Sequence, residues 1–205
     1  MFKRNAGYVL LVLLVITGLA SQITTPTLSS KERRFLVTHL KSSRASLLSQ
    51  IENLDKAQLN FKPSPSAPSI REYLQSLVVA EKQLWNQAYA NIQQKSPARF
   101  DRAPLSDEEV LERASKRAGR ETPPRQKGLT NEKALTTDEA LMVFDDTRAA
   151  VIKFAKTSTG NVRSQSSIST IGIVDGYGLL LLLSANTDRY TQEIAAIKAH
   201  PRFPQ

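Results

Sequence analysis

The stretch GYGLLLLLSA, Gly176 to Ala185, constrains the fold of this chain more than any other segment. A surface helix carries its apolar residues on one face, whereas a helix built from this stretch is apolar in nearly every direction. Such a helix needs other elements around it. We therefore expect a helix from about Val174 to Lys198, ended by Pro201, at the centre of a helical bundle.

Three further long helices are predicted from capping residues that precede apolar residues at helical spacing. Ser30 is the candidate N-cap of the first helix. Ser69 with Glu72 forms a capping box at the start of the second, because serine is followed three residues later by glutamate. Thr136 with Glu139 forms another at the start of the third. The apolar stripes are Leu36, Leu40, Leu47, Ile51 and Leu54 in the first helix, Ile70, Tyr73, Leu77, Ala80, Leu84 and Ala88 in the second, and Leu141, Phe144, Val151, Ile152 and Ala155 in the third.

Proline-rich and polar segments separate these helices. The segment FKPSPSAP, Phe61–Pro68, ends the first helix because its prolines lack backbone donors and fix an extended geometry. The second helix then runs to about Gln94. Residues 96–135 form a long crossover with one short helix, from Ser106 to about Arg117, and Thr157–Thr170 is rich in serine, threonine and glycine and is expected to be a loop.

Four long helices, without a convincing strand pattern, predict an all-α fold. The long crossover lies between the second and third helices, and this arrangement is typical of four-helix bundles with a crossover connection. We expect the bundle to span residues 30–200, with a short tail at 201–205.

The N-terminus has the pattern of a secretory signal. Two basic residues precede the apolar run Ala6–Ala20, which ends in the small residues that a signal peptidase prefers and predicts cleavage before Ser21. At about 15 residues the run is shorter than the roughly 20 needed to cross a bilayer as a helix. We expect a signal peptide at 1–20 and a linker at 21–29, with an uncleaved inner-membrane anchor as the alternative. In both cases the folded domain faces outward, in the periplasm or the medium.

Composition narrows the set of partners. The formal net charge of +9 would suit an anionic partner, but acidic residues are interleaved with the basic ones. Aromatic residues make up only 6% of the chain, too few for a surface on which bases stack. We predict no nucleic-acid partner, and association with anionic lipid is an alternative that depends on charge alone.

Motifs for several kinds of chemistry are missing from the sequence. It has no cysteine, which excludes disulfides, zinc–thiolate sites and thiol nucleophiles. It also has no glycine-rich phosphate loop and no G-x-S-x-G elbow. The two histidines, His39 in the first helix and His200 in the tail, lie on unlike elements and are interpreted as ordinary surface or boundary residues.

Several motifs, in a fixed order, resemble the DinB-like domain family, in particular its exported bacterial members. They are LKSSR before the first loop, QLNFKP leading into it, SIRE at the start of the second helix, FDDTR in the third, and the closing run DGYGLLLLLSANTDRYTQEI that leads to a final F-P. The resemblance covers most of residues 30–204 and implies a four-helix bundle. Many members of that family bind a divalent metal through three histidines, and some act as metal-dependent thiol transferases or related enzymes.

The resemblance also implies where such a metal would be bound. The family's second-helix histidine corresponds to Ser76, and its pair of histidines in the last helix corresponds to Asn186 and Tyr190. Hydroxyl and amide groups are weak, neutral ligands for metals that proteins bind through imidazole, thiolate or carboxylate. The resemblance therefore implies that the metal site has been lost, and no cofactor is expected.

Three interpretations of these positions stay open. Glu81 and Asp188 could form a displaced carboxylate site, although their helical positions point away from the lost ligands. Alternatively, Ser76, Asn186 and Tyr190 line a polar cleft that binds a small organic molecule without metal, or they form a polar cluster satisfied inside the bundle. Nearby, Arg148 follows the apolar stripe of the third helix, so we expect it to be buried and to pair with Glu81.

The expected function is that of an exported, non-catalytic binding or interaction module of the cell envelope. Its partner is a small molecule or a protein of unknown identity, and a second copy of the chain is one candidate. Membrane contact is expected only through an uncleaved N-terminal segment. The alternative is a metal-dependent transferase or hydrolase that uses displaced ligands.

Overall fold

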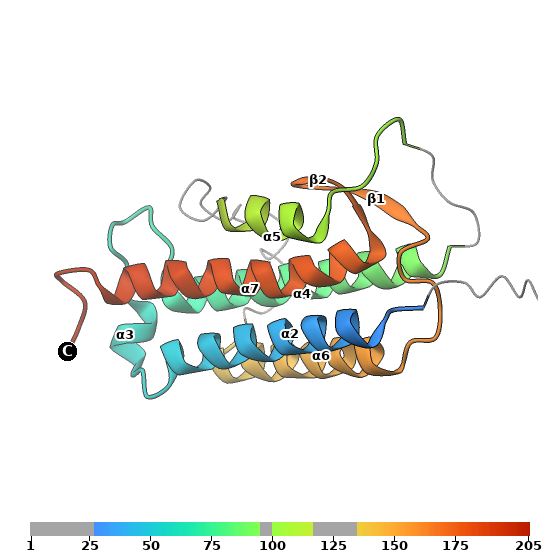
Figure 1. Ribbon diagram of the computed structural model, residues 1–205. Coiled ribbons are helices and arrows are strands. Elements are labelled where there is room, and N and C mark those ends of the chain that lie inside the picture. Colours follow the sequence, from blue (N-terminus) through green and yellow to red (C-terminus); the bar gives the residue numbers. More distant parts are fainter. Residues whose placement is uncertain (1–26, 95–99, 117–134) are drawn as a thin grey trace, which may run out of the picture.

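The computed structural model describes residues 27–94, 100–116 and 135–205 (Figure 1). In chain order the elements in these ranges are α2 Ser30–Ile51, α3 Lys56–Asn60, α4 Ile70–Ile92, α5 Asp107–Lys116, α6 Thr137–Thr157, β1 Ser166–Ser169, β2 Gly172–Asp175 and α7 Gly176–Lys198. The predicted signal segment, most of the predicted linker and two parts of the predicted crossover lie outside the described residues. No helix in the described ranges is both long and apolar enough to cross a membrane.

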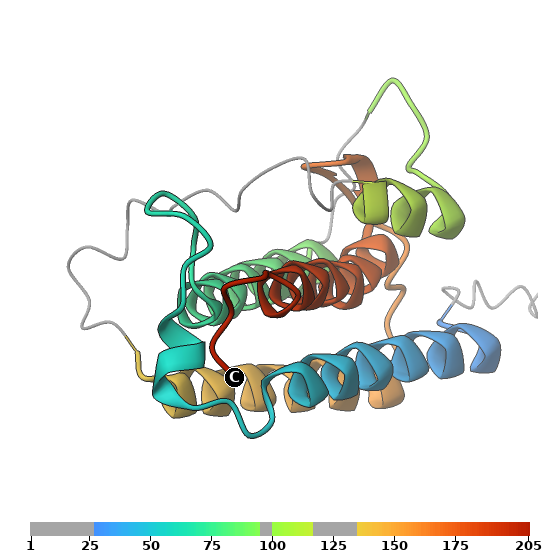
Figure 2. The same cartoon turned by 90° about the vertical axis from the view of Figure 1, so that its left-hand side faces the viewer.

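The four long helices are arranged in two layers, with α4 and α7 side by side in one and α2 and α6 in the other (Figures 1 and 2). The short helix α5, which belongs to the crossover between α4 and α6, packs on α7. A two-stranded sheet lies beside α5 near the start of α7 (Figure 1). The prediction of an all-α four-helix bundle with a long crossover is confirmed, and the small sheet is the addition to it.

Helix α7 lies at the centre of the bundle, where it packs against α4, α2 and α5. Leu179, Leu180 and Leu181 are each 0% exposed. Consecutive helical residues point about 100° apart, so three buried neighbours in a row require cover on several sides of the helix. Burial of each leucine contributes about 1.5–3 kcal/mol. The apolar character that predicted this central position therefore also stabilises it.

The predicted capping boxes are present, with one correction of position. Ser69 and Thr136 each accept a hydrogen bond from the backbone of the glutamate three residues later. At the first helix the N-cap is Ser29, so the prediction of Ser30 is wrong by one residue. The side chain of Glu32 explains the shift, because it accepts a hydrogen bond from Ser29 N at 2.7 Å while Glu32 N donates to Ser29 Oγ at 3.2 Å.

The first helix is also shorter than its apolar stripe suggested. It ends at Ile51, and Asn53 follows with a positive φ of 62°, a conformation that asparagine tolerates better than most residues. Leu54 therefore lies beyond the helix, although it still packs against the core. Asp55 then caps the short helix α3, which the sequence analysis did not separate from the first helix.

The segment before α7 differs from the prediction, because part of the expected loop Thr157–Thr170 forms β1. This strand pairs antiparallel with β2, so that Ser166 lies opposite Asp175 and Ser169 opposite Gly172. Val174 belongs to β2, and the prediction that it starts the last helix is wrong. Helix α7 begins two residues later because the side chain of Asp175 accepts a hydrogen bond from Gly178 N at 2.7 Å and caps it.

Arg163 connects the N-terminal ends of α2, α5 and α7, at the end of the bundle where α7 begins. Its guanidinium forms ion pairs of 2.8 Å with Glu32 in α2, Asp107 in α5 and Asp175 at the cap of α7. It also lies over the ring of Tyr177, with the guanidinium carbon 4.1 Å from the ring centroid. Charge-assisted hydrogen bonds of this kind are stronger than neutral ones. They fix α5 and the hairpin relative to the bundle, which shapes the cavity between α5 and α2 described below.

Candidate functional site

The three residues implied by the resemblance lie along the contact between α4 and α7, whose directions are opposite (Figure 1). Tyr73 of α4 and Tyr190 of α7 meet edge to face, with ring centroids 6.0 Å apart. Ser76 lies one turn further along α4, and Asn186 lies one turn back along α7. In an antiparallel pair these two steps lead to the same level. The fold therefore places Ser76, Asn186 and Tyr190 in one region of the bundle.

The polar groups of these residues are largely used inside the protein. Ser76 Oγ donates a hydrogen bond to the carbonyl of Glu72 in its own helix at 2.9 Å. Asn186 Oδ1 accepts one from Arg189 Nη2 at 3.1 Å. Among the described residues, Asn186 Nδ2 is buried without a hydrogen-bond partner. The Asn186 amide therefore has hydrogen-bonding capacity that no described residue uses.

Tyr190 is 3% exposed and is covered by neighbouring side chains. The guanidinium carbon of Arg189 lies 4.4 Å from its ring centroid. Burial raises the pKa of Tyr190 above its ordinary value, while nearby Arg189 lowers it. Burial also raises the pKa of Tyr73 to about 12, and the carboxylate of Glu193 adds to the shift. Both phenols therefore stay protonated at neutral pH and do not act as anionic ligands.

A fully buried ion pair lies in the same bundle, as predicted. Arg148 Nη2 is 2.7 Å from Glu81 Oε1, and both side chains are 0% exposed. The guanidinium also donates to Thr187 Oγ1 at 2.6 Å and to Ser43 Oγ at 3.3 Å. Within the described ranges, neither oxygen of Glu81 accepts a well-aligned hydrogen bond. Burial raises the pKa of Glu81 to about 7, although Arg148 and Thr187 lower it.

The two carboxylates considered for a displaced metal site have different surroundings. Glu81 is enclosed with Arg148, whereas Asp188 lines a surface cavity. In the part of the chain that the structure describes, no three side chains of histidine, cysteine, aspartate or glutamate are grouped so that they could hold a metal ion. The electrostatic neighbours of Asp188 are His39 and Arg148.

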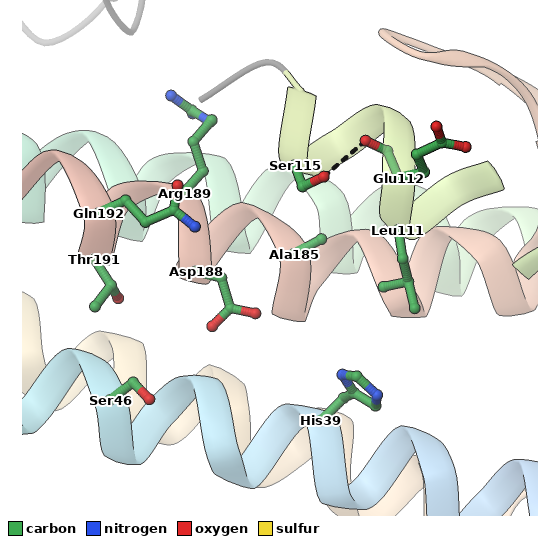
Figure 3. A pocket seen from close by; sticks show the side chains of 10 residues that line it. All are labelled: His39, Ser46, Leu111, Glu112, Ser115, Ala185, Asp188, Arg189, Thr191 and Gln192. Atoms are coloured by element: carbon green, nitrogen blue, oxygen red, sulfur yellow. Dashed lines mark hydrogen bonds between the residues drawn. The ribbon is translucent and has the colours of Figure 1, made fainter. Parts of the chain in front are cut away.

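The cavity that contains Asp188 lies between α2, α5 and α7 and has a volume of about 580 Å³. Figure 3 shows Asp188 directed from α7 toward α2 and His39 directed from α2 toward α7. Ser46, Leu111, Glu112, Ser115, Ala185, Arg189, Thr191 and Gln192 complete the lining. Sequence reasoning treated His39 as an ordinary residue and missed this site. It had no means of placing the short helix α5, which supplies one wall.

Comparison with known proteins identifies the family. The chain matches the DinB superfamily over residues 39–164. It belongs to the DinB superfamily. The matched segment contains Ser76 but ends before α7, which carries Asn186 and Tyr190. The resemblance seen in the sequence is confirmed at the level of the superfamily.

A solved structure agrees with this assignment. YfiT from Bacillus subtilis, described as a probable metal-dependent hydrolase with an unusual four-helix bundle topology, is similar with a TM-score of 0.59. The similarity covers 84% of this chain and 89% of YfiT, at 11% sequence identity. At that identity the likeness shows the fold of this DinB superfamily protein and nothing about its chemistry. No curated protein matches the sequence.

Proposed function

We propose that this DinB superfamily protein is exported, lacks the three-histidine metal site of its relatives and acts as a non-catalytic binding or interaction module of the cell envelope. The observation that carries the proposal is the donor set along the α4–α7 contact. Ser76 and Asn186 offer a neutral hydroxyl and a neutral amide, and Tyr190 is a buried phenol with a raised pKa. Such groups do not fit zinc, nickel or iron, which proteins bind through imidazole, thiolate or carboxylate.

The alternative function is a metal-dependent transferase or hydrolase with displaced ligands. It is suggested by the description of YfiT, which shares the fold, as a probable metal-dependent hydrolase. Glu81 gives it little support as a displaced ligand, because it is fully buried and paired with Arg148. A metal bound there would have to displace that arginine from a site closed to solvent.

Restoring the three histidines is expected to create a metal site. The variant Ser76→His, Asn186→His, Tyr190→His should bind Zn²⁺ or Ni²⁺ with one ion per chain, whereas the parent protein should bind neither, because imidazole is a strong ligand for these metals and the parent has no histidine at these positions. Isothermal titration calorimetry measures metal binding by the variant and by the parent, after circular dichroism has shown that the variant is folded. The double variant Asn186→His, Tyr190→His is the control and should bind at least about tenfold more weakly. A parent that binds as tightly as the triple variant would contradict the proposal.

Export is the second part of the proposal, and the apolar run Ala6–Ala20 with its basic flank supports it. The protein recovered from the outward-facing compartment is expected to begin at Ser21, because the run has the length of a signal peptide. N-terminal sequencing after cell fractionation measures this. Membrane-bound protein with an intact N-terminus would support the anchor instead, and protein retained in the cytoplasm would contradict export.

The kind of partner that such a module would bind is the third part of the proposal. A small molecule or another protein is the favoured partner, and a second copy of the chain is a further candidate. We propose no nucleic-acid partner, because basic and acidic residues alternate along the sequence. Contact with the membrane is proposed only through the N-terminal segment, if it is not cleaved.

A further inference from the structure

The cavity between α2, α5 and α7 lies on the opposite side of α7 from the contact with α4. Asp188 follows Asn186 by two residues, a rotation of about 200° around a helix. It is partly buried and directed toward His39 on the facing helix (Figure 3). The cavity is therefore a separate site from the region of Ser76, Asn186 and Tyr190.

Asp188 is a charged group of this cavity that has no hydrogen-bond partner among the described residues. It has electrostatic interactions with His39 and Arg148, but Arg148 is already paired with Glu81. The other charged side chains of the lining are engaged elsewhere. Arg189 donates to Asn186 and points away from the space between α2 and α7, and Glu112 is paired with Lys116 (Figure 3). A partly desolvated carboxylate thus opens into the cavity, and none of the described residues uses its hydrogen-bonding capacity.

The walls of the cavity are suited to a ligand with a short apolar part. Leu111 and Ala185 supply apolar surface beside Asp188, and the hydroxyl of Ser46 and the amide of Gln192 supply neutral polar groups. A volume of about 580 Å³ lies within the range of about 300–1,000 Å³ typical of small-molecule sites. A charged ligand group would be held by a charge-assisted hydrogen bond, which is about twice as strong as a neutral one.

We propose that this cavity binds a small organic cation, an amine with a short alkyl chain, whose ammonium group donates to Asp188 while His39 faces it from α2. The alkyl chain lies against Leu111 and Ala185. A metal ion fits less well, because His39 and Asp188 are two ligands where structural and catalytic zinc sites use three or four. The inference rests on the proposed function in one respect: it names the ligand class that a non-catalytic binding module would take.

The two histidines of the chain allow a direct test with the whole protein. His39 lines the cavity, whereas His200 lies in the tail with its ring 5.5 Å from that of Phe61, measured between centroids. Their imidazole C–H signals in an NMR spectrum, assigned with the variant His200→Gln, report on binding at the two places separately. The probes are n-butylammonium chloride, the neutral analogue n-butanol and the anionic analogue sodium butyrate, each at constant ionic strength.

The expected result is a saturable shift of the His39 signals with n-butylammonium, no change at His200, and much weaker effects of butanol and butyrate. Asp188→Asn should raise the dissociation constant at least about tenfold, because it removes the charge that the ammonium contacts. Asp146→Asn is the matched control, since Asp146 is an exposed helical carboxylate outside the cavity, and it should bind as the parent does. Ser46→Leu, which fills the cavity and leaves Asp188 in place, should also abolish binding.

Three results would overturn the inference: no saturable His39 shift with n-butylammonium, tighter binding of butyrate than of n-butylammonium, or unchanged binding in folded Asp188→Asn. If Asp188→Asn does not fold, unchanged binding in Ser46→Leu overturns it in the same way. The proposed absence of a metal site is tested by metal content and not by these titrations. Failure of the amine site is therefore distinguishable from failure of the proposed function.

Discussion

Gly176→Ala is expected to destabilise the protein by at least about 3 kcal/mol or to prevent folding. A Cβ atom at position 176 would lie 2.2 Å from the carbonyl oxygen of Val162 and 2.8 Å from Ile92 Cγ1. The carbonyl belongs to the backbone and cannot rotate away as a side chain would. Gly176 N also donates to the carbonyl of Gln165 at 3.0 Å, which holds the start of α7 against this loop. The substitution must therefore shift the end of the bundle.

Urea denaturation of the two proteins measures this effect, and Gly160→Ala is the matched control. No atom lies within 4 Å of a Cβ added at Gly160, and its φ is not in the positive range that disfavours alanine. We expect the control to change the free energy of unfolding by no more than about 1 kcal/mol, with a small stabilisation from the less flexible unfolded chain. Equal stability of the two variants would contradict the close packing described at the start of α7.

At pH 8, above the raised pKa of Glu81, Arg148→Met is expected to lower the free energy of unfolding by about 3–5 kcal/mol, because it leaves Glu81 buried without its ionic partner. The double variant Glu81→Leu, Arg148→Met should recover most of this loss, since a buried ion pair replaced by apolar groups of similar size is often neutral. A double-mutant cycle with Glu81→Leu alone gives the coupling between the two side chains. Additive losses would contradict a direct ionic interaction at 2.7 Å.

The same pair has an expected pH dependence. The pKa of Glu81 is raised from 4.5 to about 7, chiefly by burial, so the folded protein binds this proton more tightly than the unfolded chain does. The stability that this provides is complete below about pH 4.5 and is lost as the pH rises through 7. Unfolding measured at pH 5 and pH 8 for the parent and Glu81→Gln isolates the effect. The advantage of the parent over the variant should shrink at pH 8, and an advantage that grows would contradict the shift.

The helical part of the fold could be predicted because its signals are local. A capping box requires two residues three positions apart, and Ser69 and Thr136 with their glutamates meet this requirement within one turn. The central position of α7 could be predicted because its first part, Gly176 to Ala185, is apolar in nearly every direction around the helix. Even the buried ion pair could be anticipated, because Arg148 lies on the line of Phe144, Val151 and Ala155, and a charge on a core face needs a partner.

The hairpin and the cavity could not be predicted, because they depend on contacts between distant segments. β1 has the sequence SSIS, which is typical of a loop, and it is a strand because it pairs with β2. The cavity needs α5 to fold back over α7, although α5 belongs to the crossover. His39 and Asp188 are separated by most of the chain, and neither lies in a recognisable motif.

The central claim is that this DinB superfamily protein holds no metal at Ser76, Asn186 and Tyr190, along the contact between α4 and α7. The metal content of the purified protein tests this claim most directly. The cells are grown with added zinc, nickel, iron and manganese, and inductively coupled plasma mass spectrometry measures the metal before and after dialysis of the protein against a chelator. We expect far less than one divalent metal ion per chain in both samples. One ion per chain that survives the chelator would contradict it, and the metal-dependent alternative would then take its place.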